Sequence, residues 1–161
     1  MLKFLNKKKN DNKGFSLVEL IIVVAIMAIL VGLLAPQYLK YVEKSRKSAD
    51  ASNLDEMVRA IQVYAADAEV TLPADTYTIT INKSRTTVTA KDTANKDAVE
   101  TALADTAPDW AKTKLKSNKW KAGTINATSV SAEITVAQDG GTTVKYTPDS
   151  LADYINKTAK N

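Results

Sequence analysis

An acidic residue stands at the start of a long apolar run in this chain. The sequence there reads KGFSLVEL, which places Gly14, Phe15 and Glu19 close together. A carboxylate inside a membrane helix costs about 2.5–3.5 kcal/mol on insertion scales, so Glu19 should either reach the lipid headgroups or pair with a cation. Cleavage between Gly14 and Phe15 would supply that cation, because the new α-amino group of Phe15 is positively charged. A glycine on the acyl side of the cleaved bond would leave a protease unhindered access.

The uncharged run after Glu19 is long enough to cross a bilayer. Together with the preceding FSLV it spans residues 15–35, close to the ~20 residues that a membrane helix needs. The run ends GLLAPQY, without the small-x-small pattern at which secretory signals are cleaved. We therefore expect the apolar segment to be retained in the mature chain.

The net charge of +4 resides in the amino-terminal leader. Residues 1–14 contain five lysines and one aspartate, which leaves 17 basic and 17 acidic residues in the rest of the chain. A basic cluster before an apolar span is expected to stay in the cytoplasm, with the remainder outside. The basic residues Lys40, Lys44, Arg46 and Lys47 beyond the run weaken this asymmetry without cancelling it.

The chain contains neither cysteine nor histidine. This composition excludes Ser-His-Asp and Cys-His triads, zinc sites of the Cys/His kind and disulfide bonds. No compact group of carboxylates or lysines stands out as a catalytic constellation either. We therefore expect no enzymatic activity, no catalytic residue, no cofactor and no bound metal.

Residues 14–17 and Glu19, followed by the apolar run, resemble the amino terminus of a type IV pilin precursor, which carries a class III signal peptide. The resemblance covers about residues 7–45 and is specific, because leader, glycine, glutamate and apolar run keep the family's spacing. It implies that a membrane prepilin peptidase cuts after Gly14 on the cytoplasmic side. The same enzyme would then methylate the amine of Phe15, so the catalytic chemistry belongs to the peptidase.

Glu19 and Phe15 are interpreted as the residues that set subunit register during assembly. An apolar stripe provides almost no register between neighbouring helices. A buried carboxylate that must find the amine of Phe15 on an adjacent subunit provides it, because an unpaired buried charge is heavily penalised.

Gly32 and Pro36 are expected to form a weak point in the helix. Proline lacks an N–H group, and its ring clashes with the carbonyl four residues back, which is that of Gly32. One expectation is a kink in an otherwise intact helix in the isolated subunit. The family resemblance implies that this stretch melts in the filament and lets the fibre stretch.

The whole chain is predicted to have an α+β fold. The long amino-terminal helix should run from Phe15 to about Glu69, with its hydrophobic half protruding and its amphipathic half packed on a small antiparallel sheet. The apolar stripe of that second half includes Leu39, Val42 and Ala49, whereas the segment EKSRKSAD at 43–50 is expected to be solvated. We divide the chain into a removed leader (1–14), a hydrophobic transmembrane and assembly helix (15–36), an amphipathic continuation (37–72) and a globular head (73–161).

The head is expected to contain paired strands and two short helices. Alternating apolar and polar residues predict strands at 76–81 and 85–90 and a hairpin across 131–146. A short helix is predicted at 93–105, capped by Thr93 or Asn95. The chain should close with a carboxy-terminal helix at 147–158, capped by Thr147.

A stretch rich in lysine and tryptophan occupies residues 110–121, WAKTKLKSNKWK. Its lysines alternate, so they would line one face of a strand. One interpretation is a surface that binds single-stranded nucleic acid or a glycan by stacking and charge. That surface-binding patch would consist of Trp110, Lys112, Lys114, Lys116, Lys119 and Trp120. The alternative, which we favour, is an edge strand guarded by lysines with its tryptophans in the core, so nucleic-acid binding is not indicated.

The resemblance implies a structural subunit, which we interpret as a major pilin. Such a subunit polymerises with copies of itself into an extracellular type IV pilus, which serves adhesion, surface motility or aggregation. Its other implied partners are the prepilin peptidase, the assembly platform with its ATPases, and the cytoplasmic membrane before assembly, where the amino terminus faces inward. Two alternatives stay open: a pseudopilin of a type II secretion or DNA-uptake machine, and a bitopic anchor that presents a binding domain. The missing cysteines make the chain similar to cysteine-free pilins of Gram-positive bacteria.

Overall fold

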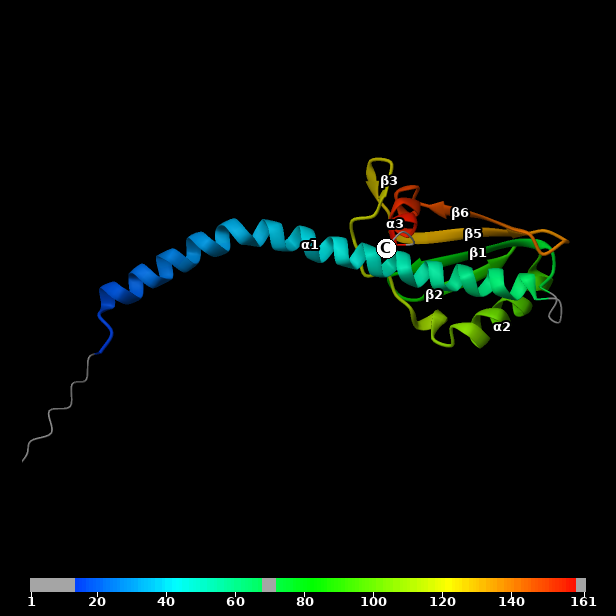
Figure 1. The fold of residues 1–161 in the computed structure, drawn as a ribbon, viewed down its shortest axis with the longest axis horizontal. Helices are drawn as coiled ribbons and strands as arrows, with labels where there is room; N and C mark the ends of the chain where they lie inside the picture. The colour runs from blue at the N-terminus through cyan, green and yellow to red at the C-terminus, as the bar shows by residue number, and fades with distance from the viewer. Residues whose placement is uncertain (1–13, 68–71, 159–161) are drawn as a thin grey trace, which may run out of the picture. The chain divides into compact units, whose positions relative to one another are not determined.

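The computed structural model describes residues 14–67 and 72–158 (Figure 1). The chain divides into two compact units, with the boundary between Lys40 and Tyr41. Helix α1 (Leu17–Ala66) contributes its first part to one unit and its second part to the other. The predicted leader lies outside the described residues except for Gly14.

Helix α1 confirms the long amino-terminal helix. It begins two residues after the predicted start at Phe15, and the predicted end near Glu69 lies outside the described residues. The helix is assigned without interruption through Pro36, so the described subunit keeps an intact helix at this position.

The buried stripe of α1 begins only in the second unit. Val42 and Ala49 are half-buried, as the predicted stripe requires. Leu39 is 62% exposed, so its assignment to that stripe is wrong, because the packed part of the helix begins beyond it. The segment 43–50 was expected to be solvated, and this is wrong for Asp50, which is fully buried.

A four-stranded antiparallel sheet, ordered β2-β1-β5-β6, forms the centre of the second unit (Figure 1). Its strands are β1 (Asp75–Asn82), β2 (Thr86–Ala90), β5 (Ser129–Val136) and β6 (Thr142–Thr147). Their limits confirm both predicted strand pairs and the α+β class. Strands β1 and β5, which are distant in sequence, pair along their whole length from Asp75↔Val136 to Asn82↔Ser129.

The core follows from the alternation of the strands and the stripe of α1. Ile79 of β1 and Ile134 of β5 point into the same cluster as Leu54, Val58 and Ile61 of α1, and all five are buried. Burying a side chain of this size contributes about 1.5–3 kcal/mol, so this contact is the main reason why α1 stays on the sheet. The opposite face of the sheet carries mostly hydroxyl and charged side chains, because the polar residues of the T-x-T pattern alternate with the buried ones.

Helix α2 (Lys96–Thr106) follows a single 3-10 turn, η1 (Thr93–Asn95). The predicted cap Thr93 is wrong, because the Asp92 carboxylate one residue earlier accepts the hydrogen bond from the Ala94 N–H at 3.0 Å. Asn95 does occupy the cap position of α2. Its side chain makes no capping bond and instead donates to Oδ2 of Asp75 at 3.0 Å.

Helix α3 (Ser150–Thr158) confirms the carboxy-terminal helix but begins three residues later than predicted. Thr147 is the last residue of β6 and pairs with Ser131, so it is not the helix cap. The carbonyl of Pro148 accepts the N–H of Leu151 at 2.8 Å at the start of the helix.

The strand predicted across 110–121 is wrong. Trp110–Lys112 form a second 3-10 turn, η2, and the chain then has no regular structure until the two-residue strand β3 (Lys121–Ala122), which pairs with β4 (Ile125–Asn126). Leu115 and Ser117 are nevertheless buried while the lysines between and beside them are exposed. The alternation in the sequence therefore reflects an extended segment with two faces. It bonds to side chains of α1, and also to the end of the sheet, where the Leu115 N–H donates to the carbonyl of Asn82 at 2.9 Å.

Candidate functional site

The first turn of α1 holds the amino-terminal candidate residues together. Oγ of Ser16 accepts a hydrogen bond from the Val18 N–H at 3.3 Å, and Oε2 of Glu19 accepts one from the Ser16 N–H at 2.8 Å. These N–H groups have no partner inside the helix, so the side chains satisfy them. The arrangement is a capping box, in which a serine and a glutamate three residues later bond to the backbone of the first turn.

This local role of Glu19 was not predicted from the sequence, although the S-x-x-E signal is present at 16–19. A carboxylate at this end of a helix is also stabilised by the helix dipole. The amide from which Glu19 accepts is the one that joins Phe15 to Ser16. The structure therefore brings Glu19 within one residue of the place where cleavage would create an amino group.

Gly14 and Phe15 lie in open surroundings. The Phe15 side chain is 90% exposed. A Cβ atom built on Gly14 would meet no atom within 4 Å, and the residue does not have the left-handed backbone conformation that favours glycine. The described fold therefore does not require glycine at position 14.

The first part of α1 is apolar on all sides and uncovered. None of its most apolar 18-residue window is buried, and by length and composition it is long enough to cross a membrane. The exposed side chains include Leu17, Ile21, Val24, Ile29 and Leu33. A helix that is hydrophobic all round requires either lipid or other helices around it.

Gly32 and Pro36 lie one turn apart in this helix. Pro36 has no N–H to donate to the carbonyl of Gly32, so one bond of the helical ladder is missing there. A Cβ at Gly32 would also meet no atom within 4 Å. Neither residue is required by packing within the described chain.

The structure separates the residues of the predicted surface-binding patch. Trp120 is fully buried and contacts the Tyr154 ring edge-on at 5.3 Å between centroids, so its place in a stacking surface is wrong. This confirms the alternative for Trp120, which put the tryptophans in the core. Trp110 is half-buried against that core, and the Lys112 Nζ pairs with Oδ1 of Asp109 at 2.8 Å.

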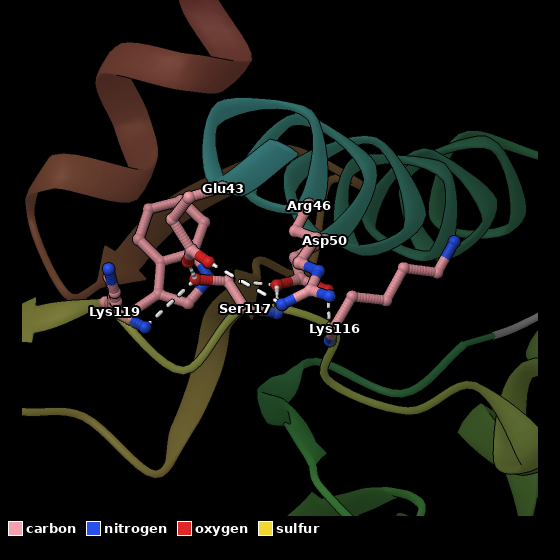
Figure 2. A network of polar contacts seen from close by, with 7 residues as sticks. Glu43, Arg46, Asp50, Lys116, Ser117 and Lys119 are labelled. Atoms are coloured by element: carbon pink, nitrogen blue, oxygen red, sulfur yellow. Dashed lines mark hydrogen bonds and ion pairs between the residues drawn. The ribbon is translucent and has the colours of Figure 1, made fainter. Parts of the chain in front are cut away.

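A second cluster of polar residues, absent from the sequence predictions, surrounds the buried carboxylate of Asp50 on α1 (Figure 2). Its Oδ1 accepts the Lys116 N–H at 2.8 Å, and its Oδ2 accepts the Ser117 N–H at 2.9 Å and Nε1–H of Trp120 at 3.0 Å. Asp50 thus fixes the irregular segment 113–120 on the helix with three hydrogen bonds.

Glu43, which lies two turns before Asp50 on α1, also belongs to this cluster. The Ser117 hydroxyl donates to Oε1 of Glu43 and accepts the Lys119 N–H at 3.1 Å. Arg46 lies on the other side of the same carboxylate, with Nη1 3.9 Å from Oε2 of Glu43 (Figure 2). Lys47 places its Nζ 5.1 Å from the centroid of the Trp120 ring. The two acids of this helix segment are therefore both engaged by groups of the protein.

One signal in the sequence points to Asp50. It lies four residues before Leu54 and next to Ala51, on the apolar stripe of α1, where an acidic residue is out of place. The same reasoning that singled out Glu19 in the apolar run also applies to Asp50, although its partners are not evident from the sequence.

Comparison with known proteins finds similarity mainly in the amino-terminal segment. Residues 9–35, which include Gly14, Phe15 and Glu19, match the family described as the prokaryotic N-terminal methylation motif. Over 61 residues the chain is 41% identical to the type IV major fimbrial protein FimA of Dichelobacter nodosus, an overlap of 38% of this chain and 39% of that protein. These similarities, centred on the amino-terminal segment, support a type IV pilin.

Two further relatives extend the comparison of this chain. It is 29% identical over 100 residues to the prepilin peptidase-dependent protein A of Clostridium perfringens, covering 61% of the pilin and 71% of that protein. It is 34% identical over 58 residues to the type IV major pilin protein PilA of Myxococcus xanthus, covering 36% of the pilin and 26% of that protein. No solved structure gives a significant match. The chain spans about two fifths of the length of FimA, so the similarity concerns mainly one segment.

Proposed function

We propose that this pilin is a structural subunit, a major pilin, that polymerises through its apolar helix into an extracellular type IV pilus. The observation that carries the proposal is the uncovered apolar first part of α1, whose first turn is capped by the Glu19 carboxylate. Before assembly, lipid of the cytoplasmic membrane surrounds this helix. In the filament the same helices of neighbouring subunits replace the lipid, which keeps the apolar surface out of water.

Processing precedes assembly in this proposal. The prepilin peptidase cuts between Gly14 and Phe15 on the cytoplasmic side and methylates the new amine. The exposure of both residues supports access by the enzyme, and the open space around Gly14 supports a role for glycine in recognition. The pilin itself supplies no catalytic group to this step and is not an enzyme.

The charge of Glu19 then fixes the register between subunits. In the described chain Glu19 accepts from the amide next to Phe15, so cleavage places the new cation at that same end of the helix. During assembly the carboxylate pairs with the Phe15 amine of a neighbouring subunit. A subunit in the wrong register leaves both charges unpaired in an apolar surrounding, which is strongly unfavourable.

The weak point at Gly32 and Pro36 belongs to the assembled state. The missing hydrogen bond lowers the cost of local melting, so this stretch lengthens when the fibre is pulled. The assembly platform and its ATPases extract the subunit from the membrane, and the resulting pilus serves adhesion, surface motility or aggregation.

The capping box allows a sharp test of the role of Glu19. Glu19→Gln keeps a residue that completes a capping box but removes the charge, whereas Glu19→Ala removes both. We expect both variants to be cut, and both to reduce the yield of sheared filaments by roughly tenfold or more, because a buried amine without its partner is heavily penalised. The control is Asp109→Asn, which changes an exposed acid far along the chain.

Three outcomes would contradict parts of this proposal. Normal filament yield from Glu19→Gln, with failure of Glu19→Ala, would assign Glu19 to helix capping alone. A chain that is cut but scarce, in a secretion or DNA-uptake complex, would favour the pseudopilin alternative. A chain whose leader stays attached and that forms no polymer would favour a membrane anchor.

A further inference from the structure

The second unit carries a concentration of positive charge at the start of its helix segment. We define the basic patch as Lys44, Arg46 and Lys47 of α1 with Lys116 and Lys119 of the segment 113–120. The contacts of Asp50 with Lys116 and Ser117 hold these two segments side by side (Figure 2). The contact of Lys47 with the Trp120 ring joins them as well. The patch is therefore a feature of the fold, because its members lie about 70 residues apart in sequence.

The patch keeps an excess of positive charge, since its five basic residues outnumber the two acids Glu43 and Asp50. Asp50 is fully buried and its oxygens accept three N–H groups. Glu43 is half-buried and accepts from the Ser117 hydroxyl, while Arg46 approaches it only at 3.9 Å. Within residues 14–67 and 72–158 the structure gives no ion pair to Lys44, Lys116 or Lys119, and all three are exposed.

The patch is tethered close to the apolar helix by a short stretch of chain. Lys44 follows Ala35, the last residue of the apolar run, by nine positions. Even a fully extended backbone of that length spans only about 30 Å, so Lys44 lies no farther than that from the end of the apolar run for any path of the chain. Tyr41 lies in this connection and is 64% exposed. Tyrosine is enriched at membrane–water interfaces, which supports placing this level of the chain at the headgroups.

We propose that the basic patch docks on anionic phospholipid headgroups of the outer leaflet while the apolar helix is in the bilayer. This inference rests on the membrane stage of the proposed function. The partner is a lipid phosphate surface, because the tether keeps that surface at high local concentration and the patch offers several unpaired cations to it. The docked state would orient the second unit on the membrane before assembly, and extraction into the filament would have to break it.

The chain suits a direct test because it contains no native cysteine. The full-length pilin is reconstituted into nanodiscs of phosphatidylcholine, or of phosphatidylcholine with phosphatidylglycerol, at one chain per disc. A fluorophore is placed at Asn118→Cys, an exposed position in the segment 113–120, and quenched by a headgroup-attached quencher. The matched control is Gln138→Cys, an exposed position in the β5–β6 turn at the other end of the sheet. A third label at Ala28→Cys reports insertion of the apolar helix.

We expect quenching at position 118 in the anionic discs and little in the neutral discs or at position 138. High salt should weaken it, because screening reduces attraction between exposed charges. The double variant Lys116→Gln/Lys119→Gln should lower the docked-to-undocked ratio roughly 25-fold, since each lysine at an anionic surface contributes about a fivefold preference. Lys145→Gln on β6, which removes one exposed lysine outside the patch, is the control and should leave the ratio unchanged.

Each contrary result has a distinct meaning. Insertion of Ala28→Cys with equal quenching at position 118 in neutral and anionic discs would overturn the docking proposal alone. Quenching that depends on two chains per disc would also overturn it, in favour of contact between copies of the pilin. Failure of the apolar helix to insert would overturn both the docking and the membrane stage of the proposed function.

Discussion

Replacing Asp50 should destabilise the second unit and release the segment 113–120 from α1. In Asp50→Ala the Ser117 N–H and the Trp120 indole N–H would be left buried without an acceptor. Each such donor costs about 1–3 kcal/mol, and the part-buried Lys116 N–H adds a smaller loss. Because the variant also removes the cost of burying a charge, we expect a total loss of about 3 kcal/mol in unfolding free energy. That is a large fraction of the 5–15 kcal/mol typical of a domain.

The variant Asp50→Asn separates the contribution of shape from that of charge. Its amide can keep an oxygen at the Oδ2 position, where two donors converge, and place its NH₂ group against the Lys116 N–H. One hydrogen bond is then lost, so we expect a smaller destabilisation of about 1–2 kcal/mol.

Urea unfolding followed by tryptophan fluorescence measures these losses, and amide hydrogen exchange at Lys116 and Ser117 reports local release. The control is Asp109→Ala, which removes an exposed acid paired with Lys112 and should leave the unfolding free energy almost unchanged, because water screens an exposed ion pair. An Asp50→Ala variant as stable as this control would refute the conclusion that the buried carboxylate holds the segment.

Two further predictions concern ionisable groups. Partial burial raises the pKa of Asp75, but hydrogen bonds from Asn95, the Asp92 N–H and the Thr76 N–H outweigh it and hold the pKa below its ordinary value. The stabilisation from Asp75 is therefore present at neutral pH and lost as the pH falls below about 4. Asp75→Asn should be less stable than the unchanged protein at pH 7, and this difference in stability should shrink in acid. A difference in urea midpoints that stays constant with pH would contradict this prediction. Burial, with a smaller effect of Asp55, raises the pKa of Tyr146 to about 12, and burial with Asp75 raises that of Tyr77 to about 12. In spectrophotometric titrations, Tyr77→Phe and Tyr146→Phe should each remove one ionisation near pH 12, and loss of an ordinary step near pH 10 instead would be inconsistent with these burials.

Periodicity explains why the helices and the sheet were predicted from the sequence. The T-x-T alternation around Ile79 and the three- and four-residue steps through Leu54 and Ile61 describe faces that are buried in the structure. These patterns are local, and each one fixes both the type of element and the side that packs. The Gly14, Phe15 and Glu19 spacing is local as well, so it was evident without the fold.

The contacts that were missed depend on residues far apart in the chain. Asp50 bonds to donors 66 to 70 residues away, and the irregular segment that carries them has an alternating pattern that also suits a strand. The predicted helix cap Thr93 was wrong because Asp92, Thr93 and Asn95 are all good capping residues, and only the observed bond from the Ala94 N–H to Asp92 identifies the cap of η1. The capping role of Glu19 was overlooked because its position in an apolar run first suggested a charge pair.

The central claim is that this pilin is processed at Gly14 and assembled into a filament. The most direct measurement is intact mass and amino-terminal sequencing of the chain recovered from the sheared surface fraction of its host. The account predicts an abundant chain that begins at Phe15 and is heavier by one methyl group, and a Gly14→Val variant whose leader stays attached although it folds normally. A chain that still begins at Met1 and is confined to membranes would contradict the account.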